Sequence, residues 1–376
     1  MIKIAIIGAG AMAKIFATRA KELNIETLCF AWEQGAIAKD SVDHFFNISI
    51  FEKDKITEIC KKEQISGVLA TTELTISIAS YISNKLNLNG NLLQVAENIT
   101  NKNWVREKAK SISIIKHPEH QWIYPDTNFA DIHLKQYPVI VKPASGGGKK
   151  GITVVNSAKE LEQALTYAKT SVKNDDGILI ERFLDQGTEY SVESLSFEKK
   201  HFIIQITQKD SSGSPHCVEL GHHQPANINS TIWQKVVAGI EELLTTLGIE
   251  NGPCHTEIKI IDSKIYLIEL NARPGGDHIA YPLTELSTGY KYITGIILAS
   301  CGIFYDPKIY LGKKMCAGVY FVSKQTSHLQ KTFDHCEQEP WCYKKNKVSE
   351  ELQEITHNDG NNINYFIYCA DKKPPL

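Results

Sequence analysis

The segment 254-CHTEIKIIDSKIYLIELNARPGGD-277 decides the fold of this chain. Two apolar-rich runs flank Asp262-Ser263-Lys264, and this pattern predicts an antiparallel β-hairpin. With a three-residue loop Glu257 faces Glu269, and Asn271 points from the same face because strand side chains alternate. A two-residue loop would place the two acids on opposite faces, so the pattern leaves the register open. Facing carboxylates with an amide oxygen suit Mg²⁺, and glutamates on a solvated strand face are the structural alternative.

A strand followed by a glycine-rich loop lies upstream, at 139-VIVKPASGGGKKGI-152. Gly146, Gly147 and Gly148 have no Cβ, so their backbone N–H groups can turn toward phosphate oxygens. Lys142, fixed on the strand, can place its ammonium group on the same phosphates. A strand rather than a helix follows, and no Gly-Lys-Ser/Thr motif is present, which excludes a P-loop. A hairpin tip without a ligand is the alternative interpretation.

The first 98 residues alternate short β-branched runs with amphipathic stretches, which predicts βαβ units and a parallel sheet. The first turn, Gly8-Ala9-Gly10-Ala11-Met12-Ala13, fits the dinucleotide-binding fingerprint, and Glu33 follows at the distance of a ribose-binding acid. Small residues at such a turn also allow a helix and a strand to pack closely. Close packing or substrate contact is therefore the favoured interpretation, and an NAD-dependent oxidoreductase is the minor one. The expected elements are strands at 2–7, 27–31 and 67–71 and helices at 12–23, 53–63 and 74–86.

Beyond Trp104 the pattern changes to paired strands with turn signals. Segment 210–229 is assigned to a polar loop, and Trp233 is assigned to the apolar, core-facing side of a helix. The expected elements are strands at 137–142, 151–155, 177–181, 190–197, 201–207, 318–323 and 363–370 and helices at 158–168 and 231–247. The chain thus divides into an N-terminal α/β domain at 1–98, a central unit at 99–301 with parts 99–180 and 181–301, and a closing unit at 302–376.

The composition excludes several classes of protein. The 376 residues include 41 Lys+Arg and 43 Asp+Glu, so a net charge of −2 gives no bulk attraction for nucleic acid or an anionic membrane. No apolar stretch is long enough to span a bilayer, and no leader pattern is present. Nine cysteines without a Cys-x-x-Cys pair predict reduced thiols in a cytoplasmic protein. Six possible zinc ligands lie near one another in the sequence, but their spacing matches no common zinc-binding pattern. They are His216, Cys217, His222, His223, Cys254 and His255.

Arginine is scarce, because only four of the 41 basic residues are Arg. A chain that favours lysine so strongly makes each arginine a candidate for a role that lysine cannot fill. The four are Arg19, Arg106, Arg182 and Arg273.

Taken together, these segments resemble the ATP-grasp superfamily over essentially the whole chain. The motifs occur in the family's order: Asn101-Lys102…Arg106, Val141-Lys142-Pro143 with its glycine loop, Ile180-Glu181-Arg182-Phe183-Leu184…Glu189, and Glu257…Glu269-Leu-Asn271-Ala-Arg273. A narrower likeness, to carboxylate–amine ligases of the L-amino-acid ligase and carbamoyl-phosphate-synthase-like group, is carried by 271-NARPGGD-277 and 221-GHHQPA-226. Asn101 departs from the Asp that commonly precedes the first lysine, and the C-terminal part is short for the group.

The resemblance implies a fold that is α/β and α+β: an N-terminal parallel, Rossmann-like domain, a central two-part ATP-binding domain and a small C-terminal unit. It also implies ATP and two Mg²⁺ ions, for which Mn²⁺ can substitute. For ATP, the resemblance implies that Lys102 and Lys142 bind the phosphates, that Gly146 to Gly148 form a lid, that Glu181, Arg182, Phe183 and Leu184 surround adenine, and that Glu189 binds the ribose. It implies that Glu257, Glu269 and Asn271 bind the metal ions and that Arg273 stabilises the transition state. The residues that it implies for the substrate are His222, Arg273, Gly276 and Asp277.

The implied activity is that of an ATP-dependent carboxylate–amine ligase. Such an enzyme forms an amide or peptide bond through an acyl phosphate and releases ADP and phosphate. A ligase of purine or bicarbonate (carboxyphosphate) metabolism is the first alternative, followed by a nucleotide-binding protein without turnover and by the NAD-dependent oxidoreductase. The expected partners are small-molecule carboxylates and amines, without nucleic acid or membrane, and relatives suggest a homodimer.

Overall fold

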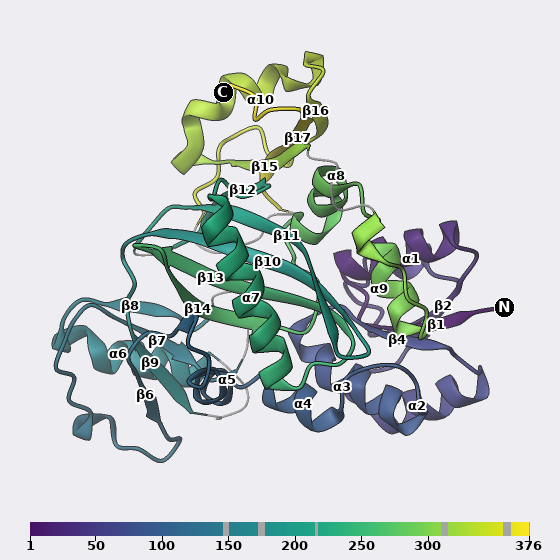
Figure 1. Ribbon diagram of the computed structural model, residues 1–376, viewed down its shortest axis with the longest axis horizontal. Coiled ribbons are helices and arrows are strands. Elements are labelled where there is room, and N and C mark those ends of the chain that lie inside the picture. Colours follow the sequence, from purple (N-terminus) through teal and green to yellow (C-terminus); the bar gives the residue numbers. More distant parts are fainter. Residues whose placement is uncertain (146–149, 172–176, 215–216, 310–314, 356–361, 376) are drawn as a thin grey trace.

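The computed structural model describes residues 1–145, 150–171, 177–214, 217–309, 315–355 and 362–375. Within these ranges the strands form one sheet of nine strands and two of four. Figure 1 shows the large sheet at the centre, the N-terminal sheet on one side of it and the second small sheet on the other. The C-terminal strands continue the large sheet at its far end.

The N-terminal sheet has the strand order β3-β2-β1-β4, with parallel pairing throughout. Its elements are β1 (Lys3–Ile7), α1 (Ala11–Glu22), β2 (Glu26–Ala31), β3 (His44–Asn47), α2 (Lys53–Lys62), β4 (Gly67–Ala70), α3 (Glu73–Lys85) and α4 (Leu93–Asn98). Residues 4–7 are all buried and apolar, because helices cover both faces of the sheet. The expected parallel sheet is therefore confirmed.

The glycine turn after β1 serves close packing. Gly8 has a φ of +95°, and a Cβ at this position would lie 2.5 Å from the Thr71 hydroxyl oxygen. Glu33, the acid expected on a ribose, is exposed and forms an ion pair with Lys39. Both observations favour the packing interpretation of this turn over the dinucleotide-binding one.

The second small sheet has the order β6-β9-β7-β8 and is antiparallel. Its elements are β6 (His120–Ile123), β7 (Val139–Pro143), β8 (Thr153–Val155), α6 (Ala158–Thr170) and β9 (Ile178–Arg182). The apolar face of α6 packs on this sheet through Leu161 and Leu165. Helix α5 (Lys102–Ala109) and strand β5 (Ile115–Lys116) precede it, and β5 joins the edge of the large sheet.

The large sheet runs in the order β16-β17-β15-β12-β11-β10-β13-β14-β5. Its other strands are β10 (Thr188–Phe197), β11 (Lys200–Ser211), β12 (Glu219–Gln224), β13 (Gly252–Ile261), β14 (Lys264–Asn271), β15 (Cys316–Val322), β16 (Cys342–Asn346) and β17 (Asn364–Ala370). The helices here are α7 (Ser230–Leu247), α8 (Thr284–Thr288), α9 (Tyr292–Ser300) and α10 (Gln330–His335). Short helical turns lie at Lys39–Ser41, Phe129–Asp131, Ile279–Leu283, Pro307–Ile309, Lys324–Leu329 and Cys336–Gln338.

Helix α7 lies across the large sheet (Figure 1) and buries Val236, Ile240 and Leu243 against it. The assignment of Trp233 to the core was wrong, since its side chain is 45% exposed. The polar loop expected at 210–229 was also wrong in part, because it contains β12. This strand is polar in sequence yet almost wholly buried, since its polar side chains pair with one another and with neighbouring strands.

The register of the β13–β14 hairpin depends on a β-bulge. The turn has two residues, Asp262 and Ser263, both with positive φ, so the shorter of the two loop lengths that the sequence left open is present. Ile258 pairs with Leu267, but Glu257 pairs with Glu269, which leaves Ile268 as an extra residue in β14. The bulge offsets the effect of the shorter turn, and the two glutamates are direct cross-strand partners.

Candidate active site

A cavity of about 890 Å³ lies where the small antiparallel sheet meets β10 to β14. Most of the predicted site residues line it: Lys102, Lys142, Glu181, Arg182, Phe183, Leu184, Glu189, Glu257, Glu269, Asn271, Arg273, Gly276 and Asp277. Gly146, Gly147 and Gly148 lie outside the described residues. His222 is fully buried and is not among the lining residues.

Glu257 and Glu269 each face a lysine. The Glu257 Oε1 atom accepts a hydrogen bond from Lys209 Nζ at 2.7 Å and lies 3.4 Å from His255 Nε2. Burial opposes ionisation of Glu257, but Lys209 and His255 outweigh it and hold the pKa of this carboxyl well below its usual value. Glu269 forms an ion pair with Lys102 at 2.9 Å. Glu257 is therefore ionised at neutral pH.

The oxygen donors at this place fit Mg²⁺. Two carboxylates lie opposite each other on neighbouring strands, and Asn271 continues β14 two residues beyond Glu269 and lines the same cavity. The hydrogen bond from Lys209 and the His255 contact fall on the same oxygen of Glu257. Hard cations such as Mg²⁺ take one or two carboxylates together with substrate phosphates and water. The donor set is thus of the type that a Mg²⁺–nucleotide complex requires.

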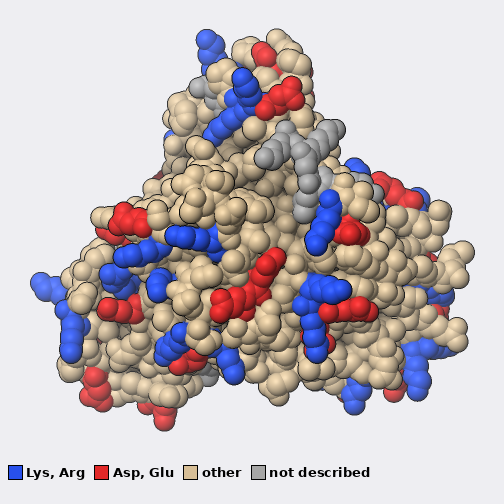
Figure 2. All heavy atoms as spheres, viewed as in Figure 1, with Lys and Arg blue, Asp and Glu red and all other residues tan. Residues whose placement is uncertain are grey.

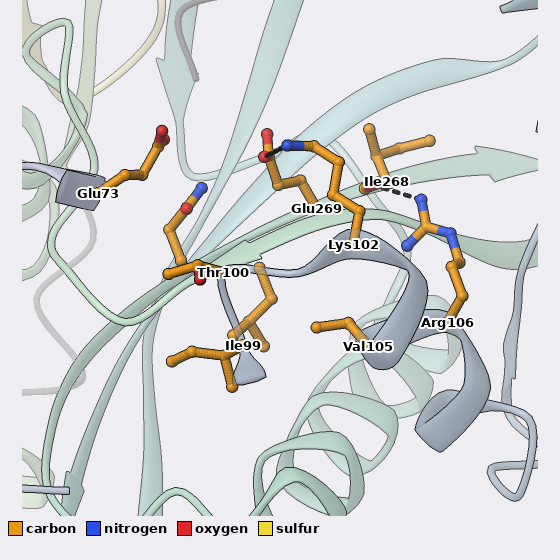
Figure 3. Close-up of a pocket in the computed structure, with 10 residues that line it drawn as sticks. Glu73, Ile99, Thr100, Lys102, Val105, Arg106, Ile268 and Glu269 are labelled. Atoms are coloured by element: carbon orange, nitrogen blue, oxygen red, sulfur yellow. Dashed lines mark hydrogen bonds and ion pairs between the residues drawn. The ribbon is translucent and has the colours of Figure 1, made fainter. Parts of the chain in front are cut away.

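Helix α5 brings two basic residues to a small adjoining pocket that shares Lys102, Glu269 and Asn271 with the cavity, as Figure 3 shows. Asn101 caps the helix by accepting a hydrogen bond from the Trp104 backbone N–H at 3.1 Å, so the amide does here what an Asp would do. Lys102, the first helical residue, reaches Glu269. One turn later Arg106 donates to the carbonyl oxygen of the bulged Ile268 at 2.6 Å.

Glu181 is buried and holds two cations. Its Oε1 atom lies 2.7 Å from Arg106 Nε, and its Oε2 atom lies 2.6 Å from Lys142 Nζ. Burial raises the pKa of Glu181, but Arg106 and Lys142 together lower it to about 2. The Glu181 side chain therefore fixes Lys142 at the cavity wall, a role beyond the adenine contact that the family resemblance implies for Glu181. Arg106, one of the four scarce arginines, makes buried structural contacts.

The segment after Glu181 combines apolar surface with backbone groups that are already paired. The backbone N–H groups of Arg182 and Phe183 donate to the carbonyls of Glu119 and Pro138. The Leu184 carbonyl accepts from Lys259 Nζ at 2.6 Å, and Lys259 lies 3.6 Å from Glu189. Apolar side chains line this end of the cavity and form a slot that suits a planar base: Ile140, Ile152, Val154, Phe183, Leu184 and Ile268.

Arg273 reaches toward the N-terminal domain. Its Nη2 atom forms an ion pair with Glu73 at 2.9 Å, and its Nη1 atom donates to the Pro274 carbonyl at 2.9 Å. Glu73 is the first residue of α3 and lines the same cavity. Glu73 was not predicted as a site residue, because an acid in the first turn of a helix is a common stabilising feature and carries no further signal in the sequence.

Lys209 and Glu219 were also missed. Lys209 Nζ lies 2.5 Å from Glu219 Oε1 and 2.7 Å from Glu257 Oε1, and all three residues line the cavity. The neighbouring carboxylates raise the pKa of Lys209 despite its burial. The predicted strand ended at 207, two residues before Lys209, whereas β11 continues to Ser211. Only the full length of the strand brings this lysine to the site.

A buried His–Glu pair supports the turn that carries Gly276 and Asp277. His255 Nδ1 lies 2.5 Å from Glu193 Oε1, and the Gly275 backbone N–H donates to Glu193 Oε2 at 3.0 Å. Burial lowers the pKa of His255, but Glu193 and Glu257 raise it to about 9. A Cβ at Gly275 would lie 2.5 Å from Glu193 Oε1, so only glycine fits beside this pair.

Comparisons with known proteins agree with this architecture. Residues 135–281 match the family model described as ATP-grasp domain. The alpha subunit of mitochondrial methylcrotonoyl-CoA carboxylase from Mus musculus is 31% identical over 160 residues, which cover 41% of this chain and 21% of that protein. Formate-dependent phosphoribosylglycinamide formyltransferase from Hydrogenovibrio crunogenus is 23% identical over 317 residues, which cover 78% of this chain and 76% of that protein.

A solved structure matches almost the whole chain. The L-amino acid ligase from Bacillus licheniformis superposes with a TM-score of 0.82 at 20% identity, covering 99% of this chain and 94% of that one. This likeness extends the shared fold from the central domain to both ends of the chain. No described helix is both long enough and apolar enough to cross a membrane. Acidic and basic side chains are interspersed over the face seen in Figure 2.

Proposed function

Because residues 135–281 are an ATP-grasp domain and the whole chain has the ATP-grasp fold, we propose that the protein is an ATP-dependent carboxylate–amine ligase. The observation that carries the proposal is the pairing of Glu257 with Glu269 beside Asn271, on the wall of the same cavity as Lys102 and Lys142. This arrangement combines oxygen donors for Mg²⁺ with ammonium groups for phosphate oxygens. We assign residues 1–98, 99–301 and 302–376 to the N-terminal, ATP-grasp and closing units.

The proposed reaction has two steps. A substrate carboxylate oxygen attacks the γ-phosphorus of ATP, and the bond from that phosphorus to the ADP oxygen breaks. The nitrogen of an amine then attacks the acyl carbon, the carbon–oxygen bond to phosphate breaks, and the amine loses a proton. The products are an amide, ADP and phosphate.

The chain's own residues divide this work between phosphate binding and charge stabilisation. Lys102 and Lys142 bind phosphate oxygens, and Lys142 is oriented by its buried contact with Glu181. Arg273 offers a planar guanidinium for the charge that develops on the transferring phosphoryl group and the acyl oxygen. Mg²⁺ held by Glu257, Glu269 and Asn271 supplies charge neutralisation on the phosphates when bound. Gly146 to Gly148 are proposed to exclude water from the acyl phosphate.

At the other end of the cavity we assign adenine to the apolar slot at Phe183 and Leu184, and the ribose to Glu189. The substrate is assigned to the side of Gly276, Asp277 and His222. Small-molecule carboxylates and amines are the proposed partners, and a homodimer is the proposed assembly, to be measured by light scattering. Cys29, Cys60, Cys254 and Cys336 are buried thiols, which supports a reducing, cytoplasmic location.

A ligase of purine or one-carbon metabolism is the second candidate. The formate-dependent formyltransferase relative aligns over most of both chains, unlike the carboxylase relative. The same active-site geometry would then activate formate or bicarbonate instead of an amino acid carboxylate. The two candidates share the first step and differ in the acid that takes the phosphoryl group.

One experiment tests the shared chemistry and separates the candidates. The full chain is incubated with ATP, Mg²⁺ and hydroxylamine in the presence of amino acids, dipeptides, formate or simple acids, and hydroxamate and ADP are measured. We expect hydroxamate with at least one class of acid and none with Glu269→Gln. Bicarbonate is tested by ADP release, because carboxyphosphate breaks down. No acid-dependent ADP release with any member of the panel would contradict the proposal.

A further inference from the structure

Three potential metal ligands gather at the substrate end of the cavity, apart from the Glu257–Glu269 pair. Glu219 and His222 belong to β12, and Asp277 lies in the turn after β14. One ligand atom from each of these residues lies within 4.8 Å of the others. Glu219 and Asp277 line the cavity, whereas His222 is not a lining residue and contacts Glu219.

A β-bulge brings Glu219 and His222 together. Residues three apart in a regular strand point to opposite faces of the sheet. In β12, Gly221 pairs with Asp210 but Glu219 pairs with Ser211, which leaves Leu220 as the extra residue. The bulge turns Glu219 to the face of His222, and Lys209, the cross-strand partner of His222, contacts Glu219 on that face.

His222 is the unusual member of the cluster. Its side chain is fully buried, and neither ring nitrogen makes a hydrogen bond with any residue that the structure describes. Its Nε2 atom nevertheless lies 3.0 Å from Glu219 Oε2, without the alignment of a hydrogen bond. A buried imidazole without hydrogen bonds is costly, because the ring loses its contacts with water.

The separation of these two atoms suits a shared metal ion. Ligand atoms about 2.0–2.2 Å from one ion, at angles between octahedral and tetrahedral values, are roughly 3–3.5 Å apart.

We propose that Glu219, His222 and Asp277 bind a divalent transition metal, of the Zn²⁺ or Co²⁺ type, at the substrate end of the cavity. An imidazole nitrogen with two carboxylate oxygens suits these ions better than Mg²⁺, which prefers oxygen ligands alone. Three protein ligands leave a tetrahedral ion one position for water or substrate. This site is separate from the Mg²⁺ donors on β13 and β14, and the inference does not rest on the proposed ligase activity.

The test is a Co²⁺ titration of the full chain, freed of metal with a chelator and held in excess Mg²⁺, followed by visible absorption. We expect the intense d–d bands of a four-coordinate Co²⁺ ion. The bands should disappear in His222→Ala, and apparent Co²⁺ affinity should fall about tenfold or more in Asp277→Asn. Asp277 is in a partly exposed turn, so this second variant keeps the test valid if His222→Ala does not fold.

Two matched controls define the site. Glu269→Gln removes a donor from the Mg²⁺ set, and His223→Gln changes the neighbouring histidine, which contacts Asp210 and Tyr368 instead. Both should retain the Co²⁺ bands. Absence of bands in the unaltered protein, or bands that persist in Asp277→Asn but vanish in Glu269→Gln, would overturn the inference. Binding of an amino acid that depends on Asp277, without any Co²⁺ binding, would overturn it as well.

Discussion

Arg273 Nη2 lies 2.9 Å from Glu73 Oε1, so an arginine at the end of β14 is held by a carboxylate of the N-terminal domain. The contact joins residues that are 200 positions apart in the chain. It makes the N-terminal domain part of the active-site wall, since both side chains line the same cavity. One ion pair therefore ties the cavity wall at Arg273 to the first turn of α3.

We predict that Glu73→Gln lowers kcat by about tenfold and changes KM for ATP by less than about threefold. The amide keeps a hydrogen-bond acceptor but lacks the charge that orients the guanidinium. Steady-state kinetics of ADP release measures both constants. Leu74→Ala, at the exposed neighbouring residue, is the control and should leave them unchanged. A Glu73→Gln enzyme with unaltered kcat would show that the ion pair has no part in turnover.

Arg273→Lys should reduce turnover by roughly two to three orders of magnitude, the scale of losing one transition-state donor, while ATP binds almost normally. A lysine supplies the charge but neither the planar fork nor the simultaneous contacts with Glu73 and the Pro274 carbonyl. Single-turnover kinetics and ATP binding by calorimetry separate the two effects. A mild loss of turnover would indicate that Arg273 has a structural role and does not stabilise the transition state.

Arg106→Met should destabilise the protein by about 3–5 kcal/mol, because it leaves the buried Glu181 with only one of its two cations. The free energy of unfolding is measured by urea denaturation. Arg182→Met is the matched control, since the Arg182 side chain is exposed, and should change stability by less than about 0.5 kcal/mol. Equal effects of the two substitutions would contradict the buried role of Arg106.

The lowered pKa of Glu181 predicts how the free energy of unfolding depends on pH. Arg106 and Lys142 hold the pKa of Glu181 at about 2, below its ordinary value of 4.5, despite burial. A depressed folded-state pKa contributes stability that is complete above pH 4.5 and is lost as the pH falls toward 2. The contribution is on the order of 3 kcal/mol. Urea midpoints between pH 6 and pH 3 should therefore fall more steeply for the unaltered protein than for Glu181→Gln. Parallel slopes would assign the acid sensitivity to other groups.

Local patterns in the sequence predicted much of the fold. The β-branched runs of the N-terminal sheet and the amphipathic spacing of α7 reflect burial on helical or strand faces, which is a local property. The prediction that Trp233 lies in the core was wrong because α7 is apolar on more than the face that packs against the sheet. Hydrophobicity alone therefore did not identify the buried side of the helix. Strand β3 was missed because four residues between polar turns are too few to show a period.

The candidate site was predicted where its donors follow one another on a single hairpin. Glu257, Glu269 and Asn271 could be grouped because strand alternation relates them, although the loop length on which that grouping depended was left open and the bulge at Ile268 produces the pairing instead. Glu73, Lys209 and Glu219 could not be grouped with them. They come from α3, β11 and β12, and only tertiary packing brings these elements to one cavity. The buried role of the Glu181 side chain depends on Arg106, 75 positions away.

The bulge at Ile268 has a consequence for how this hairpin tolerates insertions and deletions. A two-residue turn with an unbulged β14 of the same length would pair Glu257 with Ile268 and direct Glu269 to the other face of the sheet. Removal of Ile268 alone would instead leave a regular ladder in which Glu257 still faces Glu269, because the pairs between Ile261–Lys264 and Ile258–Leu267 do not change. A variant of this hairpin that lacks the bulge should therefore keep the two carboxylates together only if it is also one residue shorter.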